Sequence, residues 1–87
     1  MAKKGSWIVY IIETKSGKLY TGITTNIDRR FKEHLEKKNG AKFFSISAPK
    51  RIVFQESYPN RSEASTREAV IKRMSRLEKL EIISDSG

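Results

Sequence analysis

The chain has 87 residues, and its 18 Lys and Arg against 10 Asp and Glu give a formal net charge of +8 and a pI near 10.0. It contains no cysteine and one histidine, which excludes disulfides, thiolate metal sites and multi-histidine zinc sites. The length predicts one domain over residues 1–87, with a core at 7–83 and flexible ends at 1–5 and 84–87.

The positive charge favours a polyanionic partner, and nucleic acid is the commonest large polyanion. Charge alone also fits a protein that is basic only for solubility. The most apolar stretch, Trp7 to Ile12, is too short to span a bilayer and lacks the cleavage site of a secretory signal. We therefore expect a cytoplasmic protein without a membrane partner.

The chain begins with a predicted β-hairpin. Residues 7–12 are dense in β-branched and aromatic side chains, which predicts a strand buried on both faces. Residues 14–17 have turn chemistry, with Gly17 available for a positive φ, and 18–22 form the return strand.

The first helix is predicted to begin near Thr25 or Asn26, because Thr25 and Asp28 fit a capping box. Gly40 ends this helix. A loop follows to residue 49, with a helical turn at 42–45.

The second half predicts a third strand at 51–55, a helix that runs to about Met74, and a short last helix at 76–83. Two capping pairs precede these helices: Asn60 with Glu63, and Ser75 with Glu78. The order strand, strand, helix, strand, helix, helix predicts an α/β protein of the α+β type, with a small three-stranded, mainly antiparallel sheet flanked by helices.

Two polar residues border the apolar stripe of the first helix. The stripe consists of Ile27, Phe31 and Leu35. Arg30 and His34 fall beside it, where the helix meets the sheet, whereas Arg29 faces water. They could belong to a site, or they could be a snorkelling arginine and a capped edge histidine.

Glu68 lies at the margin of the buried side predicted for the following helix. That side consists of Ala64, Val70, Ile71 and Met74. A carboxylate at such a margin is hydrated, paired or bound to a metal, because burying it alone is costly. The simplest alternative to a site is a salt bridge to Lys72, one turn further on.

Tyr10 and Tyr20 come from the two hairpin strands. Pairing about the 16–17 turn places them diagonally or near opposite ends of the paired region, and the register is left open. Gly22 leaves space beside Tyr20 for a phosphate or a backbone to approach closely. The plain alternative is two amphipathic aromatic residues at the edge of the core.

These residues together resemble the GIY-YIG nuclease superfamily, most closely its small stand-alone bacterial members. The first motif is present as Ile8-Val9-Tyr10 and the second as Tyr20-Thr21-Gly22. Arg30 matches the family arginine, His34 a position that is His or Tyr, and Glu68 the metal-binding glutamate. The resemblance spans roughly Trp7 to Ile83.

Two positions depart from the family pattern. Ile8 stands where the name-giving motif has its first glycine, a change typical of the small branch. Several family nucleases carry an asparagine about a dozen residues after the glutamate, and residues 80–85 contain none. The second departure bears on catalytic turnover, whereas the expected fold is unaffected.

The resemblance implies a metal-dependent endonuclease that hydrolyses phosphodiester bonds in DNA with low sequence specificity. Glu68 would hold one Mg²⁺ or Mn²⁺, and Arg30 would bind a non-bridging oxygen. Tyr10 is the first choice as base, with Tyr20 on the phosphate, although these two roles could be exchanged. His34 would share the proton transfer or hold the phosphate.

Other readings stay open at this stage. One is a nucleic-acid-binding module with the nuclease fold but little turnover. Another is an adaptor that docks through the last helix, by Leu77, Leu80 and Ile83. A protein partner could supply the specificity that a single domain lacks. DNA or RNA, branched or linear substrate, and oligomeric state are not decided by the sequence.

Overall fold

The structure is a computed structural model that describes residues 6–36 and 48–86. Three strands and three helices follow one another in the predicted order. They are β1 (Trp7–Thr14), β2 (Leu19–Thr24), α1 (Ile27–Glu36), β3 (Pro49–Tyr58), α3 (Arg61–Lys72) and α4 (Arg76–Ser86). The strands form one sheet in the order β2-β1-β3, and both pairings are antiparallel. The α+β class and the three-stranded sheet are confirmed.

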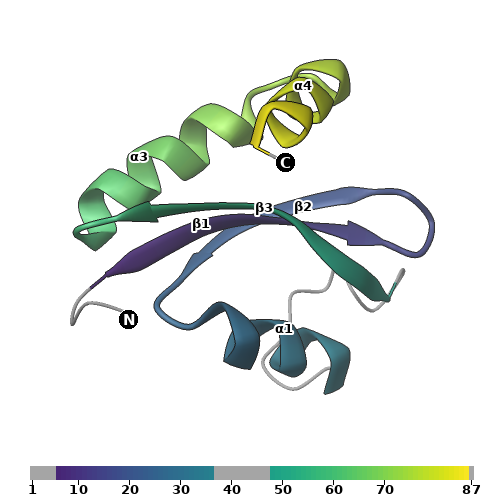
Figure 1. Cartoon of the computed structure of the whole chain (residues 1–87), viewed down its shortest axis with the longest axis horizontal. Helices are drawn as coiled ribbons and strands as arrows, with labels where there is room; N and C mark the ends of the chain where they lie inside the picture. Colours follow the sequence, from purple (N-terminus) through teal and green to yellow (C-terminus); the bar gives the residue numbers. More distant parts are fainter. Residues whose placement is uncertain (1–5, 37–47, 87) are drawn as a thin grey trace.

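The sheet separates the helices into two layers. α1 covers one face, and α3 and α4 cover the other (Figure 1). Side chains alternate along the central strand β1, so Val9 and Ile11 face α3 and α4, while Tyr10 and Ile12 face α1. All four are buried, which confirms a strand with two covered faces.

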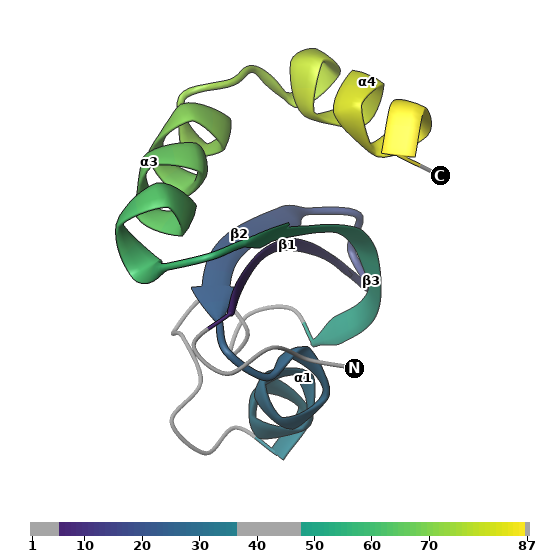
Figure 2. The ribbon, with the colours of Figure 1, turned by 60° about the vertical axis from the view of Figure 1, so that its left-hand side comes forward.

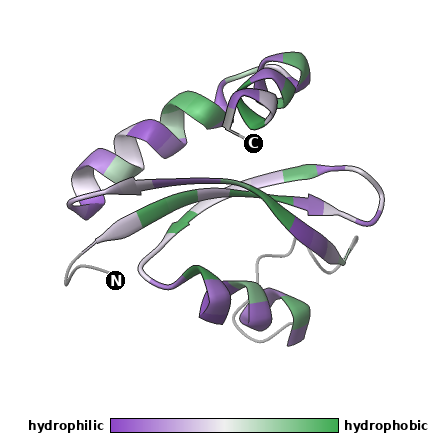
Figure 3. Cartoon of the chain, viewed as in Figure 1, coloured by the Kyte–Doolittle hydropathy of each residue, from purple (hydrophilic) through white to green (hydrophobic). Residues whose placement is uncertain are grey.

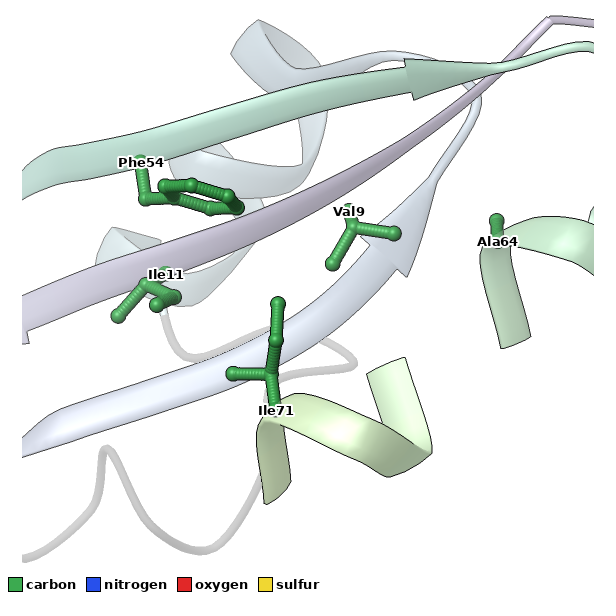
Figure 4. Close-up of a cluster of buried hydrophobic side chains, with 5 residues drawn as sticks. All are labelled: Val9, Ile11, Phe54, Ala64 and Ile71. Carbon is green, nitrogen blue, oxygen red and sulfur yellow. The ribbon is translucent and has the colours of Figure 1, made fainter. Parts of the chain in front are cut away.

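The face under α3 and α4 holds an aliphatic core. Its buried members are Val9, Ile11, Phe54, Ala64 and Ile71, and Figure 4 shows Ile71 of α3 directed at the strand residues. Apolar residues therefore line the middle of the strands, while polar residues gather on the outer sides of the helices (Figure 3). This layer is held by burial of hydrocarbon.

The hairpin turn sets the register of β1 and β2. Gly17 adopts φ +89°, in the region that favours glycine, and its N–H donates to the carbonyl oxygen of Thr14 at 2.9 Å. Across the ladder Tyr10 pairs with Gly22, and Ile12 pairs with Tyr20. The two tyrosines are therefore diagonal neighbours on the α1 face.

The sheet bends toward α1, most visibly at β3 (Figure 2). The ladder between β1 and β3 shifts register between Ile11 and Ile12 and again between Glu13 and Thr14. Such bulges increase the local twist and bend of a strand. The bend brings the sheet around the buried side of α1.

The helix starts follow the predicted chemistry with one correction. Asn26, rather than Thr25, caps α1, since its Oδ1 accepts from the Arg29 N–H at 3.0 Å. The Asn60 and Ser75 caps are confirmed: the N–H of Glu63 donates to Asn60 Oδ1 at 2.9 Å, and that of Glu78 to Ser75 Oγ at 3.2 Å.

Some other expectations change. Leu35 is 51% exposed, whereas His34 is fully buried, because the buried side of α1 is centred on Ile27 and not on Phe31. Val70, expected in the core, is 37% exposed. β3 is longer than predicted, and α4 extends beyond residue 83 to Ser86.

The predicted helix end at Gly40 and the helical turn at 42–45 lie outside the described residues. Within residues 6–36 and 48–86, no helix is both long and apolar enough to cross a membrane.

Candidate active site

Three aromatic rings from three elements meet on the α1 face of the sheet. Tyr10 of β1 and Tyr20 of β2 have ring centroids 6.4 Å apart, and His34 of α1 lies 6.3 Å from the first ring and 5.5 Å from the second. The Tyr10 hydroxyl forms a hydrogen bond of 3.2 Å with His34 Nε2. Alternation along the strands and the helical spacing of α1 together produce this cluster.

Gly22 makes room for the Tyr10 phenol. A Cβ atom at residue 22 would lie 2.5 Å from the Tyr10 hydroxyl and 2.7 Å from its ring carbon Cζ. The space that the sequence assigned to an approaching phosphate is thus occupied by the phenol from the neighbouring strand. The glycine of the second motif is required for close packing, since its φ is not in the left-handed region.

Arg30 brings a permanent positive charge to the cluster. Its side chain is 26% exposed, and its Nη1 donates to Glu33 Oε1 at 3.0 Å. Its guanidinium also donates toward the Tyr10 oxygen, which lowers the pKa of that phenol. The adjacent Arg29 is 59% exposed and faces water, as predicted.

Burial dominates the electrostatics of Tyr10. Loss of hydration and, to a smaller extent, the nearby Tyr20 raise the pKa of this phenol, Arg30 offsets only part of the rise, and the resulting pKa is about 12. Tyr10 is therefore a neutral hydrogen-bonding phenol at neutral pH. The charge and hydrogen bond of Arg30 alone therefore do not make this phenol a base at neutral pH.

His34 is also neutral at pH 7. Its burial, reinforced by the charge of Arg30, lowers its pKa from 6.5 to about 4, although Glu33 acts in the opposite direction. In the tautomer whose Nε2 carries no proton, that nitrogen accepts the hydrogen bond from the Tyr10 hydroxyl. Tyr10 then stands between a donor, Arg30, and an acceptor, His34.

Glu68 approaches from the other layer. α3 packs against all three strands, and Arg67 reaches β3, where its Nε bonds Glu56 Oε1 at 2.8 Å. Glu68 flanks the buried stripe of α3 on the side opposite Arg67. It is therefore directed away from β3 and toward the β2 edge. Its Oε2 pairs with Lys72 Nζ at 3.2 Å, and its charge contributes to the raised pKa of Tyr10.

The structure therefore brings Tyr10, Tyr20, Arg30 and His34 into one cluster, with Glu68 acting on it through charge. The expected salt bridge from Glu68 to Lys72 is present. Where the chain is described, no three acidic or histidine side chains gather as a metal cluster. A metal ion at this place would have one protein carboxylate, Glu68.

One buried polar residue of β2, on the other face of the sheet, was not singled out from the sequence. Thr21 is 4% exposed and faces the α3 layer, opposite Ile11 in the ladder. Its hydroxyl has no hydrogen-bond partner within residues 6–36 and 48–86. A buried hydroxyl without a partner costs free energy, so such groups are candidates for a functional role. The signal in the sequence is a threonine at an inward-facing position inside the second motif.

Comparison with known proteins decides the family. The family model described as the GIY-YIG catalytic domain matches residues 6–81. The chain belongs to the GIY-YIG family. GIY-YIG domains form a nuclease family whose substrate class is nucleic acid and which generally uses a divalent metal.

This GIY-YIG chain is similar to several small bacterial UPF0213 proteins. It is 43% identical to one from Desulfotalea psychrophila, over 93% of this chain and 74% of the relative. It is 42% identical to one from Staphylococcus saprophyticus, over 88% of this chain and 93% of the relative. The solution NMR structure of the UPF0213 protein BH0048 from Bacillus halodurans superimposes with a TM-score of 0.61 at 39% identity, covering 94% and 86% of the two chains.

Proposed function

We propose that this GIY-YIG protein is a metal-dependent endonuclease that hydrolyses phosphodiester bonds in DNA with little sequence specificity. The observation that carries the proposal is the meeting of Tyr10, Tyr20, His34 and Arg30 on one face of the hairpin. A buried phenol that accepts from a guanidinium and donates to an imidazole is suited to moving a proton beside a phosphate.

The donor set fits a divalent ion held by one carboxylate. Mg²⁺ often keeps several waters and takes only one or two protein carboxylates, with substrate phosphates as further ligands. Glu68 would hold the ion, after releasing the Lys72 amine that pairs with it at 3.2 Å. When bound, the ion supplies positive charge that stabilises the phosphoryl group and the leaving oxygen.

Arg30 would bind a non-bridging phosphate oxygen. Its guanidinium is always charged, is partly exposed and is anchored by Glu33. Tyr20 would contact the same phosphate from β2. Both residues would orient the phosphodiester relative to the Tyr10 hydroxyl.

Tyr10 and His34 would carry the proton. A phenol with a pKa of about 12 does not ionise by itself at neutral pH. It can, however, accept a proton from the attacking water while it passes its own to His34 Nε2, 3.2 Å away. This relay leaves Tyr10 neutral before and after the transfer, so no phenolate is needed in the resting protein.

A nucleic-acid-binding module without turnover is the second candidate. Two observations favour it: burial raises the pKa of Tyr10, and Lys72 occupies the carboxylate of Glu68. Both features oppose metal-dependent chemistry in the resting protein. The two candidates differ in whether bound DNA is cut.

The test is cleavage of supercoiled and branched DNA with Mg²⁺ or Mn²⁺ by the wild-type chain and by Glu68→Gln. We expect metal-dependent cutting by the wild type and a loss of about 100-fold or more in the variant, because it lacks the metal ligand. Binding of DNA without any cutting by the wild type would establish the module instead.

Lys72→Gln is the matched control. It removes the same ion pair but keeps the carboxylate, and an exposed i,i+4 pair contributes only about 0.3–0.5 kcal/mol to folding. We expect it to keep its activity. If both variants lose activity equally, the salt bridge matters and Glu68 is not a metal ligand.

A further inference from the structure

A basic hollow of about 230 Å³ lies between the start of β2 and the first turns of α4. It is lined by Lys18, Leu19, Arg76 and Lys79. Three of these four residues are cationic. None of the three forms an ion pair with another residue in 6–36 or 48–86, whereas Arg30, Arg51, Arg67 and Lys72 all do.

The surroundings of the hollow are also basic. Lys50 and Arg51 lie near the start of β3, at the same end of the sheet, where Arg51 pairs with Glu13 across the ladder at 2.8 Å. The hydrogen bond from Arg51 lowers the pKa of Glu13, and the charges of Lys50 and Arg76 lower it further. One carboxylate thus faces several cations, and this end keeps a positive potential.

The opposite side of α4 carries the reverse charge. A second hollow, of about 470 Å³, is lined by residues that include Glu78, Glu81 and Asp85. α4 is therefore basic toward the hairpin and acidic on its other side. A polyanion is attracted to one side of this helix and repelled from the other.

We propose that the basic hollow binds a backbone phosphate of the nucleic acid, at a distance from the phosphate that is cut. This inference rests on the proposed function for the location of the cut. Lysine supplies a compact positive charge and arginine a planar fork that matches phosphate, so the lining suits a phosphodiester.

The hollow and the aromatic cluster lie along the same edge strand but on opposite faces of the sheet, since Leu19 packs against the α3 and α4 core and Tyr20 belongs to the α1 face. Leu19 lines the hollow, and Gly22 lies against the Tyr10 phenol, three residues along the same edge strand. At about 3.3 Å per residue, this separation is about 10 Å. A backbone that passes this edge of the sheet would therefore place in the hollow a phosphate other than the one that is cut.

The first experiment compares two variants with the same change of charge. Lys18→Gln/Arg76→Gln removes two cations of the hollow, and Lys32→Gln/Arg73→Gln removes one exposed lysine and one exposed arginine elsewhere. Binding of a short DNA duplex is measured by fluorescence anisotropy against salt concentration, without a divalent metal. Circular dichroism checks that each variant is folded.

We expect the hollow variant to lower the slope of log K against log salt by about 0.9, the value for one lost phosphate contact, and to weaken binding about ten-fold at low salt. The control should change the slope much less. Equal changes in the two variants would overturn the inference, because the effect would then be one of net charge.

The second experiment replaces single phosphates by neutral methylphosphonates. A replacement at one position away from the cut phosphate should weaken binding to the wild type and leave binding to the hollow variant unchanged. If no replaced position behaves in this way, the inference is overturned. The inference is also overturned if added inorganic phosphate abolishes the difference in DNA binding between the wild type and the hollow variant, since the hollow would then be a site for a small anion.

These outcomes separate the inference from the proposed function. Binding that depends on the hollow, without any cutting, leaves the phosphate site standing and overturns the endonuclease. If instead cutting depends on a metal and on Glu68, and the hollow variant binds DNA as the control variant does, the endonuclease stands and the phosphate site is overturned.

Discussion

The two faces of β1 differ in chemistry although their residues alternate along one strand. Val9 and Ile11 enter an aliphatic core, where shape and burial are the only requirements. Tyr10, on the other face, meets Tyr20, His34 and Arg30 through hydrogen bonds and ring contacts. The α3 and α4 side is thus built from buried apolar side chains alone, whereas the polar groups of the candidate site lie on the α1 side.

Truncation of the aliphatic face should have the largest effect on stability. Ile11→Ala removes a fully buried side chain and should lower the free energy of unfolding by about 2–5 kcal/mol, through lost burial and a residual cavity. Tyr10→Phe removes one hydroxyl and should cost only about 1 kcal/mol. Urea unfolding of both variants measures the difference. Similar losses would show that the two faces share the stabilising role.

Removal of the charge on the other face should affect cleavage instead. Arg30→Ala should reduce the cleavage rate about 10²–10³-fold, the usual effect of losing one donor to a developing oxyanion. The neighbouring Arg29, exposed on the same helix, gives the control variant Arg29→Ala, which should cleave nearly normally. Cleavage rates at saturating protein decide this point. Equal rates for both variants would remove Arg30 from the site.

The close contact between the strands can be tested at a glycine. Gly22→Ala places a Cβ 2.5 Å from the Tyr10 hydroxyl, which should displace the phenol, cost about 1–3 kcal/mol and reduce cleavage. Gly17→Ala is strained by its φ of +89° but has nothing within 4 Å of the new Cβ. It should lose stability and keep the activity of its folded fraction. A Gly22 variant with normal cleavage would contradict the assigned place of Tyr10.

Lowering the pH should lower the free energy of unfolding through protonation of His34. Its pKa is 6.5 in the unfolded chain and about 4 in the folded one, so the unfolded chain takes up the proton first as the pH falls. The histidine contribution is complete above about pH 6.5 and should fall by about 1–2 kcal/mol between pH 7 and pH 5. Thermal unfolding against pH measures it. The variant His34→Gln should lack this part of the pH dependence. A pH profile identical to that of the wild type would show that His34 does not cause it.

The order of strands and helices along the chain and two of the helix caps were predicted correctly, because these depend on local chemistry. Asn60 and Ser75 accept from their own helices in the way that capping pairs predict. The exact cap of α1 was missed because Thr25 and Asn26 are both good capping residues. In the structure Asn26 caps α1, and its backbone N–H donates a hydrogen bond of 3.2 Å to the Thr24 hydroxyl.

The candidate site was predictable only in its composition. The motifs identified the residues, but not that the Tyr10 phenol fills the space above Gly22, because this depends on the register of two strands. The exposure of Leu35 depends on how far α1 rotates on the sheet, which helical periodicity does not fix. The pKa of Tyr10 depends on burial by several elements, which no short motif encodes.

The alternation of β1 has a consequence for how this protein tolerates change. A shift of β1 by one position against its neighbours would exchange the sides of Tyr10 and Ile11, since side-chain direction repeats every two residues. The phenol would then enter the hydrocarbon layer, and an isoleucine would face His34. Insertions in the turn around Gly17 spare this arrangement if the ladder is kept, whereas one residue added inside β1 disrupts the core packing and the candidate site together.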